Sequence, residues 1–160
     1  MNENIRTPDV LILKFEDRFA PDFARLSREW LERYFEVDDR DRAYIDHPRT
    51  AIIEKGGEVF FALLDGEVVG TCAAIRMNDE VIELAKLAVT PRAQGLGIGR
   101  MLSDAVLIWA RDSGASKVVL VSSSILAPAL RLYESMGFVY ARQEGERWYR
   151  EADVYMELTL

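Results

Sequence analysis

Several residue types that carry common site chemistries are almost missing from this sequence. It contains a single cysteine, Cys72, and a single histidine, His47. One cysteine cannot form an internal disulfide, and so few Cys and His residues leave no recognisable metal cluster. No apolar run approaches the roughly 20 residues that a membrane helix needs, and the first residues lack the basic and apolar regions of a signal peptide. We therefore expect a cytoplasmic protein that binds neither a metal nor a membrane.

Basic residues are also scarce relative to acidic ones. The 160 residues include 20 Lys and Arg against 27 Asp and Glu, which gives a net charge of −7. This charge disfavours binding to nucleic acid and would suit a cationic partner, although solubility alone would also explain it. With 49% hydrophobic residues and no repeat or linker to mark a boundary, we expect a single domain over residues 1–160.

The spacing of apolar residues predicts an α+β fold. Strands are expected where apolar and β-branched residues run between turn signals, and helices where apolar residues recur every three or four positions. The expected strands are 10–15, 59–64, 68–77, 81–89, 117–122, 138–142 and 153–158, and the expected helices are 21–34, 39–46, about 97–113 and 126–136. Short turns such as Asp65-Gly66 indicate that the strands between 59 and 89 form an antiparallel meander.

A glycine-rich turn follows the central expected strand. The segment Gln94-Gly95-Leu96-Gly97-Ile98-Gly99-Arg100 joins a strand that ends at Val89 to a helix that begins near Gly97. Alternate glycines let the backbone approach a ligand, and the first turn of a helix offers unpaired N–H donors to an anion. Arg100 stands where a dinucleotide fingerprint needs glycine, and the chain has no Gly-Lys-Ser or Gly-Lys-Thr of a P-loop. The pattern Q-x-x-G-x-G therefore predicts a different phosphate-binding turn, with an ordinary strand-to-helix turn as the alternative.

This turn and its neighbours resemble the GNAT N-acetyltransferase superfamily, in particular one bacterial branch. The resemblance rests on Glu83 to Pro91, the Q-x-x-G-x-G turn and Leu132 to Phe138 in that order, with Gly56-Gly57 and Ala152 to Leu158 in support. It covers nearly the whole chain. It implies a mixed, mostly antiparallel sheet of about seven strands, splayed at its centre and flanked by about four helices. It also implies acetyl-CoA as cosubstrate and an amine acceptor, either a small molecule or a protein amine.

The resemblance assigns most cofactor contacts to the backbone. The residues matching Leu87, Ala88 and Val89 would bind the pantetheine arm much as an added strand would. The pyrophosphate would be held by the residues that match Gln94, Gly95, Leu96, Gly97, Ile98, Gly99 and Arg100. Leu126 is also counted among the residues that would bind the cofactor, at a position where many members carry Asn. Any role of that Asn is absent here or is taken by a nearby serine, Ser122, Ser123 or Ser124. The alternative for these serines is capping of the following helix.

Glu83 is the candidate general base. An amine with a lysine-like pKa near 10.4 is protonated at pH 7, so exposing its lone pair costs roughly 4.6 kcal/mol. Glu83 matches the glutamate base of histone acetyltransferases in the same superfamily, and it could act directly or through water. By strand alternation it would face with Ala85 and Leu87, opposite Lys86. The alternative is a solvated carboxylate on a half-exposed strand.

Tyr133 is the candidate acid, because it matches the family tyrosine that protonates or hydrogen-bonds the departing thiolate. Its alternative is core packing, since Leu126, Leu130 and Tyr133 share a helical face. Cys72 is expected to be a small buried strand residue. These residues predict direct acetyl transfer in a ternary complex, and the alternative is a noncatalytic acyl-CoA-binding or sensing module.

The identity of the acceptor is not readable from the sequence. In proteins of this superfamily the first two helices flank the acceptor cleft, so their acidic residues could attract a cationic acceptor or simply form a solvated face. These residues are Glu29, Glu32, Glu36, Asp38, Asp39, Asp41 and Asp46. Similar proteins often form homodimers, but no feature of this sequence signals one.

Overall fold

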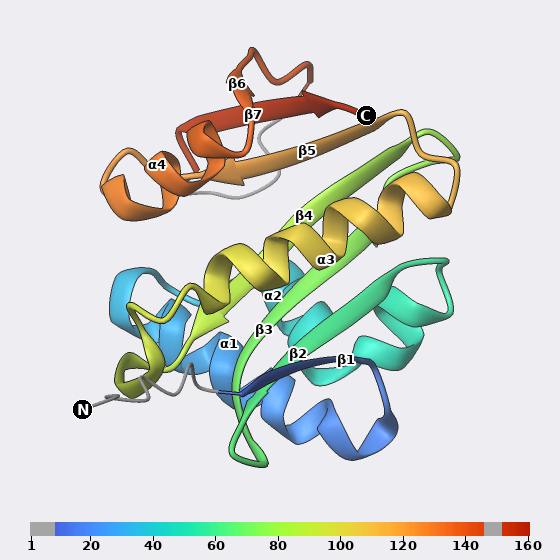
Figure 1. Cartoon of the computed structure of the whole chain (residues 1–160). Helices are drawn as coiled ribbons and strands as arrows, with labels where there is room; N and C mark the ends of the chain where they lie inside the picture. Colours follow the sequence, from blue (N-terminus) through green and yellow to red (C-terminus); the bar gives the residue numbers. More distant parts are fainter. Residues whose placement is uncertain (1–8, 146–151) are drawn as a thin grey trace, which may run out of the picture.

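The centre of the molecule is a seven-stranded sheet with the order β1-β2-β3-β4-β5-β7-β6 (Figure 1). The computed structural model describes residues 9–145 and 152–160, so positions 1–8 and 146–151 of the expected domain lie outside the described residues. The strands are β1 Val10–Lys14, β2 Glu58–Leu64, β3 Glu67–Arg76, β4 Val81–Val89, β5 Lys117–Ser122, β6 Val139–Tyr140 and β7 Val154–Thr159. Strands β4 and β5 pair in parallel, whereas the other neighbours in the described sheet are antiparallel. The predicted sheet is confirmed, although β6 is shorter than expected.

Four α-helices flank the sheet, as predicted. They are α1 Ala20–Tyr34, α2 Asp39–Asp46, α3 Ile98–Asp112 and α4 Ala127–Ser135. Helices α1 and α2 lie on one face and α3 on the other, with α4 beside β5 and β7 (Figure 1). Helix α2 begins where the sequence indicates, because the carboxylate of Asp38 accepts a hydrogen bond of 2.8 Å from the N–H of Asp41. A π-helical turn over Arg49–Ile53 was not predicted, since five residues are too few to show a helical period.

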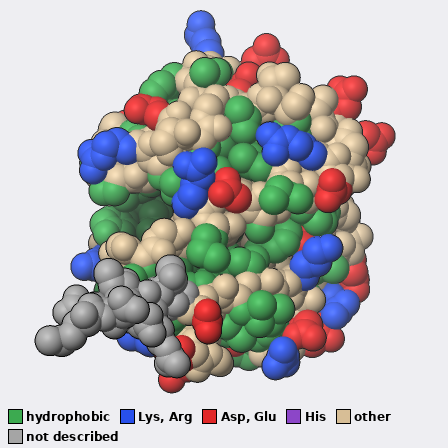
Figure 2. Space-filling model, viewed as in Figure 1, with side chains coloured by type: hydrophobic (Ala, Val, Ile, Leu, Met, Phe, Trp, Pro, Cys, Tyr) green, Lys and Arg blue, Asp and Glu red, His purple; other side chains and the backbone are tan. Residues whose placement is uncertain are grey.

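Strand alternation divides the apolar side chains between two cores. Phe60, Cys72 and Leu84 pack under α3, and Phe61 and Ile75 pack on the opposite face. Cys72 is fully buried, as expected. Figure 2 shows the outer surface on the α3 side, where hydrophobic side chains gather over the helix with acidic and basic side chains interspersed around them.

Helix α3 lies unusually close to the sheet at its first turns. A Cβ atom at Gly70 of β3 would stand 3.0 Å from Leu102 and 3.2 Å from Ile98. Glycine at this position therefore allows the start of α3 to pack directly on the strand, which fixes the glycine-rich turn relative to the end of β4.

The sheet splays at its centre, as the resemblance implies. Strands β4 and β5 pair over three residues on each side, from Val81 with Lys117 to Glu83 with Val119. Beyond Glu83, β4 continues beside β3 alone in the described sheet, and β5 diverges from it (Figure 1). Glu83 therefore stands at the point where the two halves of the sheet separate.

A β-bulge in β4 changes which side chains share a face. The register with β3 shifts opposite Thr71 to Ala73, and Lys86 takes a left-handed conformation with φ of +56°. Ala85 shares the face of Glu83, as predicted, and packs with Ile75. The other half of that prediction is wrong, because Leu87 packs on the α3 side and Lys86 reaches Asp41 of α2 on the opposite face. The extra residue of the bulge inverts the alternation after Ala85.

Candidate active site

A cavity of about 760 Å³ passes through the splay between β4 and β5. It reaches both faces of the sheet, so that groups from α3 and α4 line one side and groups from α1, α2 and the loop between them line the other. Of the residues predicted to bind the cofactor, those that line it are Leu87, Ala88, Val89, Gln94, Gly95, Gly97, Ile98, Gly99, Arg100 and Leu126. Leu96 does not line it and is 43% exposed.

The glycine-rich turn has the geometry of an anion-binding helix start. Gly95 and Gly97 have φ of +82° and +79°, and no atom lies within 4 Å of the position that a Cβ would take at either. Helix α3 begins at Ile98, and the first N–H that reaches back along the helix is that of Met101, which donates to Gly97 O at 3.1 Å. The N–H groups that precede Met101 in the first turn of α3 have no acceptor within the helix, so they can donate hydrogen bonds to a phosphate.

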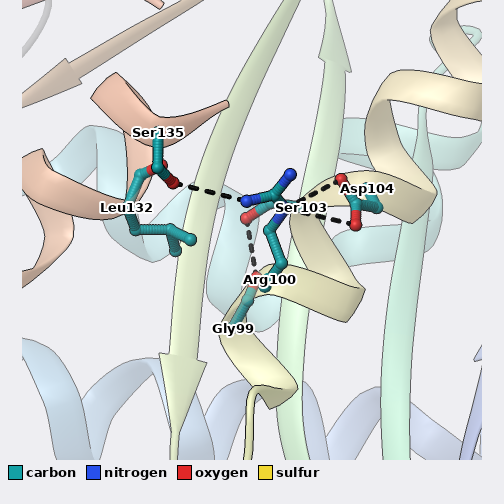
Figure 3. A network of polar contacts seen from close by, with 6 residues as sticks. All are labelled: Gly99, Arg100, Ser103, Asp104, Leu132 and Ser135. Atoms are coloured by element: carbon teal, nitrogen blue, oxygen red, sulfur yellow. Dashed lines mark hydrogen bonds and ion pairs between the residues drawn. The ribbon is translucent and has the colours of Figure 1, made fainter. Parts of the chain in front are cut away.

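Side chains tie this turn to its surroundings. Gln94 Nε2 donates to the carbonyl oxygen of Val89 at 3.2 Å, which closes the turn onto the end of β4. Arg100 donates to Asp104 and to Ser135 Oγ of α4, each at 3.3 Å (Figure 3). Ser135 Oγ in turn donates to the carbonyl oxygen of Leu132 at 2.6 Å. Arg100 therefore links α3 to α4 at the edge of the cavity, where its positive charge is partly offset by Asp104.

Glu83 faces the α1 and α2 side of the sheet and lines the cavity. It is paired in register with Ile75, whose side chain belongs to the core on that face. Its exposed fraction is 0%, so the solvated-carboxylate interpretation is wrong. Burial raises the pKa of Tyr155 to about 12, with contributions from Glu157, Glu144 and, as the smallest, Glu83.

Tyr133 lines the same cavity from the opposite face. It packs in the core under α3, with its ring 5.8 Å from that of Phe138 in an edge-on arrangement. Burial, with a smaller contribution from Cys72, raises the pKa of the Tyr133 phenol, so the hydroxyl keeps its proton at neutral pH. Tyr133 therefore both packs in the core and lines the cavity.

The residues at the start of α4 do not behave as capping residues. Leu126 is the N-cap, and no side chain caps the helix there. Ser124 instead binds Asp153 through its N–H at 2.8 Å and its Oγ at 2.6 Å. Ser122 and Ser123 line the cavity, and Ser123 Oγ accepts a hydrogen bond of 3.4 Å from the N–H of Ile125, before the helix begins. No side chain caps α4, so the helix-capping interpretation of the three serines is wrong.

The acceptor side of the cavity, as we call its α1 and α2 side, is acidic and aromatic. It is lined by carboxylates and rings, with one lysine: Trp30, Tyr34, Phe35, Glu36, Asp38, Asp41, Glu83 and Lys86. Lys86 forms a buried ion pair with Asp41, in which the two side chains are 8% and 5% exposed. Of the acidic residues singled out in the sequence, Asp39 and Asp46 instead pair with Arg42 and Arg28 at the surface.

Two polar residues of this side were not recognised from the sequence. Lys86 was assigned to the wrong face because a bulge at a non-glycine residue leaves no pattern. Ser27 is 2% exposed, lines the cavity, and its Oγ has no hydrogen-bond partner among the described residues. A signal for Ser27 did exist, because it lies four residues from both Phe23 and Leu31 in the buried stripe of α1.

Other chemistries find less support within residues 9–145 and 152–160. Burial raises the pKa of the Cys72 thiol, which keeps it protonated and unsuited to act as a nucleophile. No group of three His, Cys, Asp or Glu residues in these ranges could hold a metal ion. Helices long and apolar enough to cross a bilayer are likewise absent from the part of the chain that the structure describes.

Solved structures share this fold. A GNAT acetyltransferase from Staphylococcus aureus superposes with a TM-score of 0.85 at 16% identity, covering 94% of this chain and 99% of its own. A GNAT acetyltransferase from Elizabethkingia anophelis, solved with acetyl-CoA bound, superposes with a TM-score of 0.69 at 19% identity, covering 94% and 98% of the two chains.

Relatives of known name occur in animals as well as in bacteria. Human N-acetyltransferase 8B is 31% identical over 152 residues, which cover 91% of this chain and 66% of the relative. Human N-acetylaspartate synthetase is 36% identical over 116 residues, or 66% of this chain and 38% of the relative. The chain thus spans 38% to 66% of the length of these two proteins. Residues 23–138 match the profile of the acetyltransferase (GNAT) family, and the chain belongs to that family.

Proposed function

We propose that this chain is an N-acetyltransferase that moves the acetyl group of acetyl-CoA to a primary amine by direct attack in a ternary complex. The observation that carries the proposal is the placement of Glu83 and Tyr133 on opposite faces of the sheet, both lining one cavity at the splay. A base on one side and a hydroxyl donor on the other match the two ends of an acyl transfer. The names of the relatives, an N-acetyltransferase and an N-acetylaspartate synthetase, also describe acetylation at nitrogen.

The residues of the glycine-rich turn would hold the diphosphate of the cosubstrate, and the splayed edge of β4 would hold its pantetheine arm. The open positions beside Gly95 and Gly97 leave room for a bulky anion against the backbone. Leu87 and Val89 lie where β4 has lost its pairing with β5 in the described sheet, so an extended chain can add there as a strand does. Acetyl-CoA supplies the thioester carbonyl that an amine attacks.

Glu83 would accept the proton that the amine must lose. Exposing the lone pair of a lysine-like amine at pH 7 costs roughly 4.6 kcal/mol, and a well-placed base contributes about 10² to 10⁴ in rate. Glu83 is excluded from bulk solvent, so an acceptor amine would reach it only from the cavity that it lines. It can take the proton directly or through one bridging water.

Tyr133 would stabilise the departing sulfur. A thiol has a pKa of about 8.5, and that of Tyr133 is raised above the usual phenol value of about 10. Full proton transfer from the phenol to a thiolate is therefore uphill by more than about 2 kcal/mol. A hydrogen bond from the hydroxyl to the sulfur needs no such transfer, and we assign that role to Tyr133.

The test is thiol release from acetyl-CoA by the purified protein with a panel of amines. The proposal expects release that depends on the amine, with a strong loss in Glu83→Gln and in Tyr133→Phe. A noncatalytic acyl-CoA-binding module is the second candidate, because the turn alone would suffice for it. Tight CoA binding without release for any amine would favour that module and overturn the proposal.

A further inference from the structure

We infer that the acceptor is a diamine or polyamine, whose reacting nitrogen reaches Glu83 while a second ammonium group lies near Glu36 and Asp38. This inference rests on the proposed function and specifies its substrate class. Three independent features of the acceptor side carry it: its charge, a buried hydroxyl and a wall of aromatic rings.

The acceptor side carries more negative charge than its single lysine can neutralise. Lys86 forms a buried ion pair with Asp41, and the carboxylates of Glu36 and Asp38 line the same side of the cavity. Within the described chain, neither Glu36 nor Asp38 forms an ion pair. Neighbouring acids that point away from the cavity do: Asp22 with Arg25, Asp39 with Arg42, and Asp46 with Arg28. The carboxylates of Glu36 and Asp38 thus lie at the cavity without a paired cation among the described residues, which favours a cationic ligand.

The buried hydroxyl of Ser27 indicates that a polar group of a ligand belongs here. Its Oγ has no hydrogen-bond partner among the described residues, although the side chain is buried at the cavity wall. Two other buried hydroxyls have partners, since Thr71 donates to Phe60 O and Ser103 donates to Gly99 O, both at 2.8 Å. A buried polar group without a partner is costly and calls for an explanation. The Ser27 oxygen can accept a hydrogen bond from an N–H group of an ammonium.

The rings form a surface suited to a methylene chain that ends in a cation. Trp30 lies 5.4 Å from Tyr34 and 5.5 Å from Phe35, measured between ring centroids. All three line the cavity, as do Glu36 and Asp38, and Phe35 directly precedes Glu36 in the chain. Aromatic faces attract ammonium groups and pack against apolar chains. An acceptor carboxylate would be repelled by the same surroundings, so amino acids such as aspartate are disfavoured here.

Three acceptors with five carbons each separate the classes. Cadaverine, pentylamine and aminovaleric acid share the reacting amine and differ at the far end, which is an ammonium, a methyl group or a carboxylate. In the thiol-release assay we expect kcat/KM for cadaverine to exceed that for pentylamine by at least about tenfold, which corresponds to one charged contact. Aminovaleric acid should be the poorest, and the advantage of cadaverine should shrink as salt is added.

Matched variants locate the second ammonium group. Asp38→Asn removes the charge but keeps an oxygen that can cap α2, so it should abolish most of the preference for cadaverine over pentylamine. Asp39→Asn is the control, because that side chain is fully exposed and does not line the cavity. Ser27→Ala should raise the KM for cadaverine without lowering thermal stability.

The outcomes distinguish the two proposals. Equal kcat/KM for pentylamine and cadaverine, a preference for aminovaleric acid, or equal effects of Asp38→Asn and Asp39→Asn would overturn the substrate class and leave acetyl transfer standing. If the protein binds CoA but acetylates no amine, both the substrate class and the proposed function fail.

Discussion

Removal of the Lys86 ammonium should destabilise the protein strongly, because it leaves the Asp41 carboxylate buried without its partner. The two side chains are 8% and 5% exposed, so water cannot replace the lost cation. Breaking a buried pair by removing one partner typically costs about 3–5 kcal/mol. For a chain of this size, that cost corresponds to a fall in Tm of roughly 6–20 °C. Lys86→Met, which keeps the length of the side chain, should show this loss in urea unfolding followed by tryptophan fluorescence.

Two controls isolate the buried pair. Arg28→Met removes the cation of an exposed pair with Asp46, in which the side chains are 39% and 41% exposed, and should cost at most about 1 kcal/mol. The double variant Lys86→Met with Asp41→Asn should recover much of the lost stability, since no unpaired charge remains. If Lys86→Met lowers the free energy of unfolding no more than Arg28→Met does, the ion pair does not hold α2 on β4, and our reasoning about the acceptor side of the cavity is refuted.

Two further predictions concern the reaction. Glu83→Gln should lower kcat by about 10² to 10⁴ at pH 7, and less as the pH approaches the pKa of the amine, while the Kd for CoA stays unchanged; a uniform loss across a pH series would remove Glu83 from proton transfer. Tyr133→Phe should lower kcat with little change in Tm. The pKa of Tyr133 is raised above about 10, so below about pH 10 the wild-type rate should not fall because Tyr133 loses its proton. A fall in rate below about pH 10 that disappears in Tyr133→Phe would contradict this prediction.

The regular parts of the fold could be predicted because each follows a local pattern. Strands β4 and β5 have the predicted limits, Val81–Val89 and Lys117–Ser122, and so does α2. The glycine-rich turn, which we propose binds the cofactor, could be recognised for the same reason. A phosphate-binding turn depends on residue types that are contiguous in the sequence.

The acceptor side could not be predicted, because it depends on contacts between distant segments. Lys86 and Asp41 are 45 residues apart, and the bulge that brings them together occurs at a residue with no propensity for positive φ. The buried position of Glu83 likewise depends on distant segments, because its face of β4 is covered in the folded chain beside Ile75. In contrast, Ser27 could have been suspected as a polar residue within an apolar helical stripe.

The most direct test of the account is calorimetric titration of CoA into two glycine variants. Gly97 and Gly114 have similar conformations, with φ of +79° and +85°, and both have open space beside them, but Gly97 alone of the two lines the cavity. Alanine at either should cost about 1–2 kcal/mol of conformational strain. A turn with alanine at position 97 should relax away from this conformation and would have to regain it to bind CoA, so we predict that Gly97→Ala weakens CoA binding by roughly 5- to 30-fold and that Gly114→Ala leaves it unchanged. Saturable binding of equal strength in both variants, or no binding by the wild type, would contradict the account.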